Sequence, residues 1–463
     1  SSDVKISKML SFDIQVKDLP RAARVLFKLR GRRKNGTAVS IGWAANTIFD
    51  FTGNMESVVD VRLFRGDIDA PIKTTLSNIN DSIAPSLSLV LAADLVMKDN
   101  STPDAQIIHG LKTSTNPVIG EDENLSDTDK AELERLKKLS FNPLALSLIT
   151  NADREYLWDL RKQLINKSDL LPAFILSMQW HNSDRVQELY ALLDLWQKPN
   201  PHQAMVLLDR RFMDPKVRAY AVHCLERLED EEMSLYMMQL CQQLKFENYA
   251  DSALSRFLLR RALRSKNLIG HIFYWQLQSE VHNNDCKRRF TLLLQMYIRH
   301  CGQHRIELGR QVFVMNRLTN VAELVCQGTS KAERLDILRN QLSETVLPSE
   351  FQLPLNPHLK VAGIDISRCR VMESKKKPLW LTMYKEDKED VVLMLKVGDD
   401  LRQDALVMQL LGVMNMLWEQ EGLEMEMMLY DCISTGHERG LLQVVPNATT
   451  VGSILLEATD KKK

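Results

Sequence analysis

The sequence has no paired cysteines and no long apolar run. Its seven cysteines are scattered singly through 463 residues, without any C-x-x-C spacing. That pattern is typical of reduced thiols and argues against a disulfide framework or a zinc ribbon. No apolar run approaches the roughly 20 residues that a membrane-spanning helix requires, and the first residues carry no signal-peptide pattern. Any membrane work is therefore expected to be peripheral.

An excess of charge of either sign is also absent. The chain carries 60 Lys and Arg against 60 Asp and Glu, with 44% hydrophobic residues. This balance argues against a general nucleic-acid binder, although a local basic patch stays open. The apolar content suffices for sizeable cores, and a length of 463 residues indicates about three domains.

Common phosphate-site signatures are missing too. Neither G-x-G-x-x-G nor G-x-x-x-x-G-K-[ST] occurs, which excludes a protein-kinase glycine loop and a Walker motif. Aspartate loops that would bind calcium are not evident, so no metal site is predicted. Residue 1 is serine rather than an initiator methionine, and residues 11–16 already alternate like a strand. We expect the chain to be a piece of a longer protein.

Residues 1–97 have the pattern of β structure. Apolar and polar residues alternate over 23–30 and again over 39–43, and Asn35-Gly36 between them is a hairpin signal. Further strand-like runs cover residues 47–51, 58–64 and 86–97. The region is predicted to form an antiparallel β-sandwich, cut short at its start.

The composition then changes twice. Residues 98–130 are rich in Ser, Thr, Asn, Asp, Pro and Gly, which predicts a linker. Capped amphipathic helices follow, beginning near residues 183, 214 and 251, and Asp214-Pro215 supplies both an N-cap and a first-turn proline. This spacing predicts a helical solenoid over 131–320, which alone would indicate a scaffold.

Two polar groups in the helical region invite a sharper interpretation. His300, Cys301 and His304 resemble a ligand cluster, but no second pair lies nearby, so satisfied or surface side chains are the preferred interpretation. The arginine-rich run 260–264 is interpreted as a solvated face, with an acidic partner domain as the alternative.

The strongest signal for chemistry lies at residues 391–404. An apolar run ends at Lys396, and a Gly-Asp-Asp turn then leads into a long predicted helix. A lysine on the same strand face as Val392 and Met394 needs an anion within reach, because an unpaired ammonium is costly to bury. A nucleotide phosphate is one candidate, and a strand-end lysine that extends to water is the alternative.

Four segments near the C-terminus resemble the phosphoinositide 3-kinases. Lys-x-Gly-Asp-Asp-Leu-Arg-Gln-Asp at 396–404 resembles the family's nucleotide-site lysine strand and the helix after it. Residues 372–380 resemble its phosphate-binding hairpin, 429–436 its inner-pocket strand and 440–445 its hinge. The order and spacing of the four segments are those of the family.

Upstream segments resemble the class I catalytic subunits. Residues 18–24, 245–249 and 270–275 carry this likeness, and Lys-Lys-Lys-Pro-Leu-Trp with Cys-Ile-Ser-Thr-Gly favours the gamma-type isoform. The implied fold class is multidomain α+β. Its parts are a partial lipid-surface sandwich of the C2 type over 1–97, a linker over 98–130, an α-helical solenoid of the PIK type over 131–320, and the N-terminal lobe of a kinase-like domain over 321–463, which would be incomplete.

The resemblance also implies an ATP site. The residues implied to hold its phosphates are Ser374, Lys375, Lys376 and Lys396. The residues implied to wall the adenine are Met372, Trp380 and Met394, for which ordinary core packing is the alternative. The inner pocket would be lined by Asp404 and Tyr430, and the hinge backbone would come from Gln443, Val444 and Val445. Class I members usually have glutamate at position 443, which should matter little because hinge recognition uses main-chain groups.

The catalytic half of such an enzyme is missing. Nowhere does the chain contain a D-R-H-x-x-N loop or a D-F-G triplet. Phosphoryl transfer needs a carboxylate-held Mg²⁺ and a group beside the attacking hydroxyl, so no catalytic or metal-binding residue is predicted here and Mg²⁺ is expected only in the full-length enzyme. The chain alone is predicted to be inactive.

The resemblance implies a parent enzyme that transfers the γ-phosphate of ATP to the inositol 3-hydroxyl of membrane phosphoinositides. Such an enzyme would be cytoplasmic and recruited to a phosphoinositide membrane surface. A regulatory subunit and a small GTPase are partners of the family, and no nucleic acid is expected. The competing hypothesis is a helical-repeat interaction scaffold with a degenerate nucleotide-binding lobe.

Overall fold

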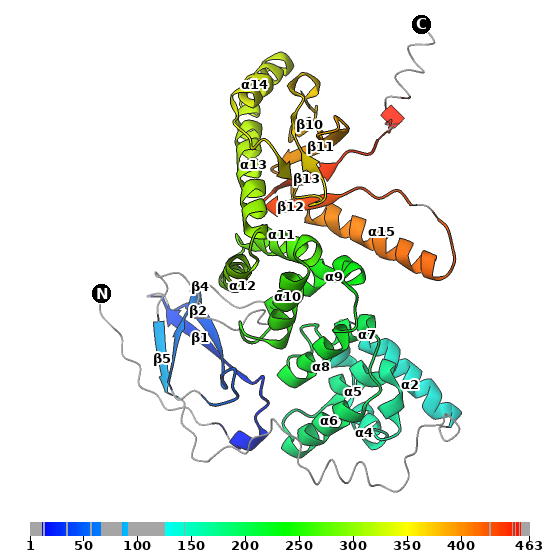
Figure 1. Ribbon diagram of the computed structural model, residues 1–463. Coiled ribbons are helices and arrows are strands. Elements are labelled where there is room, and N and C mark those ends of the chain that lie inside the picture. The colour runs from blue at the N-terminus through cyan, green and yellow to red at the C-terminus, as the bar shows by residue number, and fades with distance from the viewer. Residues whose placement is uncertain are drawn as a thin grey trace. The chain divides into compact units, whose positions relative to one another are not determined.

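The computed structural model has a mixed helical and sheet fold (Figure 1). It describes residues 12, 14–33, 36–55, 58–65, 86–90, 126–142, 144–425, 427–446, 448–449, 451–452 and 454. The chain divides into two compact units, Ser1–Leu228 with Gln242–Phe257, and Glu229–Cys241 with Leu258–Lys463. Most of the predicted linker lies outside the described residues. The predicted four-part division stays a prediction.

The first unit begins with antiparallel strands. β1 (Arg24–Arg32) pairs with β2 (Ala38–Thr47) with a register shift after Leu29, and β4 (Phe64–Arg65) adds to β2. A second pair joins β3 (Val58–Arg62) to β5 (Ser86–Val90). The burial of β1 alternates as predicted. Asn35 of the predicted turn lies outside the described residues, whereas Gly36 has a φ of 81°, which suits a tight turn. The sandwich itself stays a prediction.

Two predicted strands are wrong for the described residues. Around 47–51 the Asp50 carboxylate accepts hydrogen bonds from the backbone N–H groups of Thr52 and Asn54, which folds the chain into a turn instead of a ladder. Near 11–16 the short 3-10 helix η1 (Val16–Asp18) forms, and Phe12 is exposed. The alternating sequence pattern alone could not predict either the turn at Asp50 or the 3-10 helix η1.

The helices of the first unit begin at polar caps. Asp214 caps its helix through Lys216 N–H at 2.9 Å and Val217 N–H at 3.0 Å, with Pro215 at the first position, so that predicted helix start is confirmed. The helices are α2 (Asp127–Ser140), α3 (Ala145–Leu148), α4 (Asn151–Asp159), α5 (Leu171–Ser177), α6 (Ser183–Leu195), α7 (Pro201–Val206) and α8 (Pro215–Leu225). α10 (Ala253–Arg264) follows, its sequence crossing the boundary between the units. The predicted starts near 183 and 251 are confirmed as well.

A buried ion pair ties the helices of this unit together. Arg218 and Glu247 have side chains that are only 3% and 6% exposed, and their nearest atoms lie 2.6 Å apart. Arg218 Nη1 also donates to the carbonyl oxygens of Leu208 at 2.7 Å and Phe212 at 3.2 Å. Every nitrogen of this guanidinium therefore has an acceptor within the unit.

The second unit combines helices with the sheet over which a kinase-like lobe is predicted. Its helices are α9 (Asp230–Gln243), α11 (His271–Glu280), α12 (Lys287–His300), α13 (His304–Val325), α14 (Lys331–Glu344) and α15 (Arg402–Gln420). A π-helical turn, Lys266–Gly270, precedes α11. Arg261 corrects the solvated-face interpretation, because it is buried and donates to Asp230 at 2.5 and 3.0 Å. His300 is exposed, while Cys301 and His304 are buried beside helix partners, as expected for satisfied or surface residues.

The main sheet of this unit has the strand order β12-β13-β11-β10-β8, with β9 also paired to β10. The strands are β6 (Phe351–Gln352), β7 (Lys360–Val361), β8 (Gly363–Ile364), β9 (Arg370–Val371), β10 (Leu379–Tyr384), β11 (Asp390–Val397), β12 (Cys432–Gly436) and β13 (Arg439–Gln443). Helix α13 runs alongside the strands and contacts β11, while α11 contacts β12 and α14 contacts β9 (Figure 1). In the part of the chain described, no helix is long and apolar enough to cross a membrane.

Candidate nucleotide site

Alternation along β10 and β11 gives the sheet two different faces. Leu381 and Leu393 lie directly opposite each other and are fully buried. The adjacent pair, Trp380 and Met394, lies on the other face and is only half-buried. Because side chains repeat every second residue, Lys396 shares this second face, as predicted from the sequence. We call it the open face.

Lys396 lies in the same neighbourhood as the Asp404 carboxylate but forms no ion pair with it. No residue that the structure describes accepts a hydrogen bond from the Lys396 ammonium or forms an ion pair with it. Its cross-strand partner on β13 is Gly440, which has no side chain to fill the neighbouring space. A Cβ at Gly440 would lie 2.2 Å from the Ile433 carbonyl oxygen, so β12 and β13 approach too closely for any larger residue. The close approach of the two strands therefore requires a glycine opposite the lysine.

The turn after β11 brings a second lysine to the same end of the sheet. Gly398 has a φ of 87° and donates its N–H to Glu438 O at 2.7 Å. A Cβ on Gly398 would sit 3.3 Å from Lys376 Nζ. The Lys376 side chain therefore lies over the turn that begins two residues after Lys396. Two of the predicted phosphate ligands thus converge on one turn.

Arg402 fastens this turn to a helix. It donates to both carboxylate oxygens of Asp400, and this hydrogen bonding holds the pKa of Asp400 at about 2. On its other side Arg402 Nη1 lies 2.9 Å from Glu280 Oε1 of α11, and the Glu280 side chain is 2% exposed. Sequence spacing gave no indication of this bridge, because 122 residues separate its two ends.

The predicted phosphate hairpin is a tight turn between β9 and β10. Met372 N–H donates to Pro378 O at 2.9 Å at its base, and Lys377 N–H donates to Ser374 O at 3.1 Å near its tip. Ser374, Lys375 and Lys376 are exposed there.

The adenine walls predicted from the sequence lie beside this hairpin. Trp380 faces Met394 across β10 and β11, and Met372 lies at the base of the hairpin. The Arg370 guanidinium sits over the Trp380 ring, 4.1 Å from its centroid, which fixes one side of the indole.

The predicted hinge residues differ in which of their main-chain N–H and C=O groups are already hydrogen-bonded within the protein. Val444 N–H donates to Val392 O at 3.0 Å and is used by the sheet. Gln443 N–H donates to Asp431 O at 2.8 Å, and Gln443 Oε1 accepts from Asp431 N–H at 3.2 Å. No described residue bonds to the main-chain N–H or C=O of Val445. Val445 is therefore the hinge position with both backbone groups open to a ligand.

The inner-pocket residues respond to one another's charge. Burial, with the negative charge of Asp404 as the next cause, raises the pKa of the Cys432 thiol to about 12, and Lys396 opposes the shift. Burial likewise raises the pKa of Tyr430, with Asp404 as the next cause. Asp404, Tyr430, Cys432 and Lys396 therefore lie in one neighbourhood. Among the residues described, no group of three or more His, Cys, Asp or Glu is placed to hold a metal ion.

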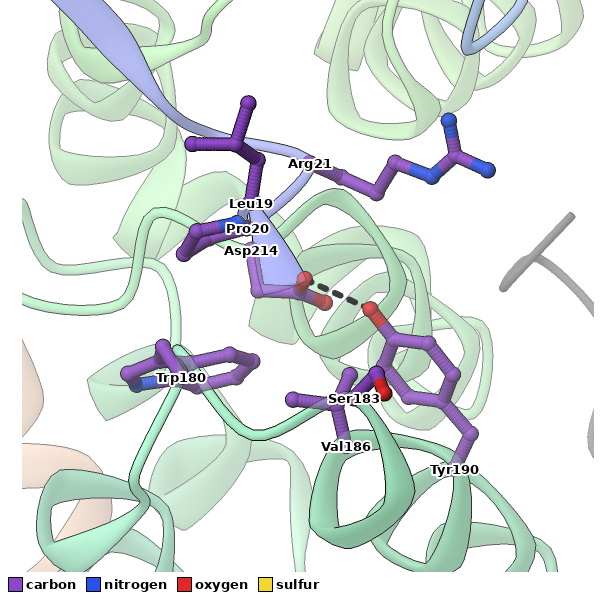
Figure 2. Close-up of a pocket in the computed structure, with 8 residues that line it drawn as sticks. All are labelled: Leu19, Pro20, Arg21, Trp180, Ser183, Val186, Tyr190 and Asp214. Atoms are coloured by element: carbon purple, nitrogen blue, oxygen red, sulfur yellow. Dashed lines mark hydrogen bonds between the residues drawn. The ribbon is translucent and has the colours of Figure 1, made fainter. Parts of the chain in front are cut away.

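A pocket in the first unit differs from this site. It lies where the segment before β1 packs on α6 and α8 (Figure 2). Its lining residues are Leu19, Pro20, Arg21, Trp180, Ser183, Val186, Tyr190 and Asp214. The carboxylate of Asp214 accepts from Tyr190 Oη at 2.8 Å, which is the dashed line in Figure 2, and it also caps α8. The Asp214 carboxylate at the pocket therefore stabilises the fold.

Three segments of the chain match known protein families. Residues 1–90 match the family described as phosphoinositide 3-kinase C2, and residues 124–310 match the accessory (PIK) domain of the phosphoinositide 3-kinase family. Residues 390–463 match phosphatidylinositol 3- and 4-kinase, a range that contains Lys396 and the hinge but not the hairpin. The chain carries the C2, accessory and kinase regions of the phosphoinositide 3-kinase family. The family resemblance is thereby confirmed, while the gamma-type assignment stays a prediction.

Curated relatives agree with this assignment. Phosphatidylinositol 3-kinase 1 of Dictyostelium discoideum is 35% identical over 422 residues, which is 89% of this chain and 26% of the relative. Phosphatidylinositol 3-kinase 2 of the same organism is 38% identical over 72% of this chain and 18% of the relative. Phosphatidylinositol 3-kinase 3 is 30% identical over 97% of this chain and 26% of the relative. The chain spans about a quarter or less of the length of these phosphoinositide 3-kinases.

Proposed function

We propose that the open face of the sheet is the ATP-binding half of a lipid kinase. The observation that carries the proposal is Lys396, a cation on a half-buried strand face with no internal acceptor among the described residues. An ammonium in that position is stabilised by an anion from outside the chain. Lys376 reaches the adjoining turn, so a polyphosphate spanning both lysines satisfies two charges at once.

The same face supplies the rest of a nucleotide cleft. Trp380 and Met394 offer apolar walls, with Met372 beside them at the hairpin base. Val445 offers an N–H donor and a C=O acceptor to the edge of an adenine. Apolar walls with a few fixed polar groups are the usual composition of such sites. We assign the α-phosphate to Lys396 and the β- and γ-phosphates to Ser374, Lys375 and Lys376.

For the whole protein we propose transfer of the γ-phosphate of ATP to the inositol 3-hydroxyl of a membrane phosphoinositide. Support comes from the family regions and from relatives named phosphatidylinositol 3-kinases. We further propose a class I catalytic subunit of gamma type, cytoplasmic and recruited to membranes, with a regulatory subunit and a small GTPase as partners. Mg²⁺ would neutralise phosphate charge during transfer, but the described residues contain no carboxylate set for it.

The decisive experiment is ATP binding by the purified chain, followed by isothermal titration calorimetry. A charged hydrogen bond contributes about 1.5 to 3 kcal/mol, so Lys396→Met should weaken ATP binding about 10- to 100-fold. Lys385→Met is the matched control, because Lys385 already pairs with Glu389 on the turn between β10 and β11. The control should bind ATP like the unmodified chain.

Two further measurements separate the alternatives. The chain alone should transfer no phosphate to phosphatidylinositol, and measurable transfer would overturn the proposal that its catalytic half is missing. An unmodified chain that fails to bind ATP at millimolar concentration would instead support a scaffold with a degenerate nucleotide lobe.

A further inference from the structure

The three consecutive lysines of the hairpin do not have equivalent surroundings. Lys375 and Lys376 are exposed, and no residue in the described part of the chain accepts a hydrogen bond from either ammonium. Lys377 is half-buried and turns back toward the helices, where its Nζ donates to the main-chain oxygen of Cys326 at 3.1 Å. The third lysine therefore already has an acceptor within the protein.

That acceptor is the end of a long helix. Cys326 is the C-cap residue of α13, and its N–H donates back to Ala322 O. Carbonyl oxygens at a helix C-terminus lack intrahelical partners and carry the negative end of the helix dipole. A lysine ammonium is a favourable group at this position. α13 is thereby joined directly to the hairpin.

A second contact holds the opposite side of the hairpin. Glu373 Oε1 lies 3.0 Å from Lys331 Nζ, at the first residue of α14. Both side chains are largely exposed, so this pair alone contributes little. Together the two contacts flank Ser374, Lys375 and Lys376 and connect both sides of the hairpin to the α13–α14 corner.

The backbone of Lys377 also needs support. Its φ is 48°, in the left-handed region that residues other than glycine seldom occupy. The bond from Lys377 N–H to Ser374 O at 3.1 Å maintains this turn, and the side-chain bond to Cys326 O fixes the turn against α13. Among the described residues, this side-chain bond is the one hydrogen bond that joins Lys377 to the helix, so its loss frees the turn from α13.

We propose that Lys377 is a positioning residue, which clasps the phosphate-binding hairpin to the C-terminus of α13 and so presents Ser374, Lys375 and Lys376 to the nucleotide. The inference rests on the proposed ATP site and adds a coupling: the position of α13 sets the affinity for phosphates. Lys377 itself does not touch the nucleotide. The rival assignment is a third phosphate ligand.

The test compares Lys377→Met with Lys375→Met in the full 463-residue chain. Amide hydrogen exchange without nucleotide reports on the hairpin, through the N–H groups of Ser374 and Lys377 that are bonded within it. Lys377→Met should speed exchange at both amides about tenfold, because loss of a bond worth about 1.4 kcal/mol changes an opening equilibrium by that factor. Lys375→Met should leave exchange unchanged.

Affinities complete the comparison. Both variants should bind ATP about tenfold more weakly and adenosine normally, since only the phosphate contacts are affected. Lys377→Arg keeps a donor and should restore slow exchange. Weaker ATP binding by Lys377→Met with unchanged exchange would make Lys377 a direct ligand, and no change in either measurement would make it a solvated lysine. If the unmodified chain binds no ATP, the proposed function fails. Amide exchange in the nucleotide-free protein still tests whether Lys377 fixes the hairpin to α13.

Discussion

Arg218 in the first unit is a buried cation and Lys396 in the second is a half-buried one, and their surroundings differ completely. The Arg218 guanidinium pairs with Glu247 and donates to several main-chain carbonyl groups. Lys396 has no such partner among the described residues. A cation whose acceptors are all internal serves the fold, whereas one without acceptors indicates a ligand from outside. The same contrast separates the Asp214 pocket from the open face.

The comparison predicts its largest effect at Arg218. Replacement by methionine leaves Glu247 as a buried charge without its partner, which should destabilise the first unit by about 3 to 5 kcal/mol. Urea unfolding followed by circular dichroism measures the loss. Arg256→Met is the matched control, since its pair with Asp251 is exposed and should contribute little to stability. Equal losses in the two variants would contradict the assignment of Arg218.

A smaller effect should come from buried histidines in the second unit. His271 Nε2 bonds to Pro354 O at 2.7 Å, and His304 Nδ1 bonds to the Tyr297 hydroxyl at 2.7 Å. Burial is the main cause that lowers the pKa of each imidazole to about 4, and the charge of Lys266 contributes to the shift of His304. Between pH 6.5 and 4 each of these two imidazoles is protonated in the unfolded chain but neutral in the folded chain. Stability should therefore be full above pH 6.5 and fall as the pH drops to 4.

The expected loss is roughly 3 kcal/mol per histidine at the acidic limit, and unfolding midpoints from pH 7 to pH 4 measure it. His304→Gln should flatten the decline, whereas His300→Gln should not, because His300 is exposed on the neighbouring helix end. A decline that stays as steep in His304→Gln would show that other groups cause it.

The smallest effect on stability is expected at Lys396, and it tests the contrast with Arg218 directly. Lys396→Met should change the free energy of unfolding by no more than about 0.5 kcal/mol, because no internal bond is lost. Thermal unfolding without nucleotide measures this, and the same concentration of ATP should raise the unfolding temperature of the unmodified chain more than that of the variant. A large loss of stability in the apo variant would mean that Lys396 serves the fold after all.

Local patterns predicted much of the site. The alternation of β11 placed Lys396 and Met394 on one face, and the Gly-Asp-Asp turn correctly preceded α15. Such features depend on residues two to five apart, whose relative directions the backbone geometry determines. The cap at Asp214 was predictable for the same reason.

Contacts between distant segments could not be predicted. Arg261 was assigned to a solvated face because its partner, Asp230, lies 31 residues earlier on another helix. Lys377 belonged to an apparent charge run, and its acceptor is a main-chain carbonyl group 51 residues away that has no side-chain signature. The role of Gly440 required knowledge of how closely two strands approach. Each of these contacts depends on tertiary packing, which the periodicity of a single sequence does not reveal.

The links between the sheet and its helices have a mechanical consequence. Arg402 joins Glu280 of α11, Lys377 joins the end of α13, and Arg439 Nη1 lies 3.1 Å from Asn316 Oδ1 on α13. Sliding the sheet over these helices would break several polar bonds together. We therefore expect the sheet, α11 and α13 to move as one rigid body.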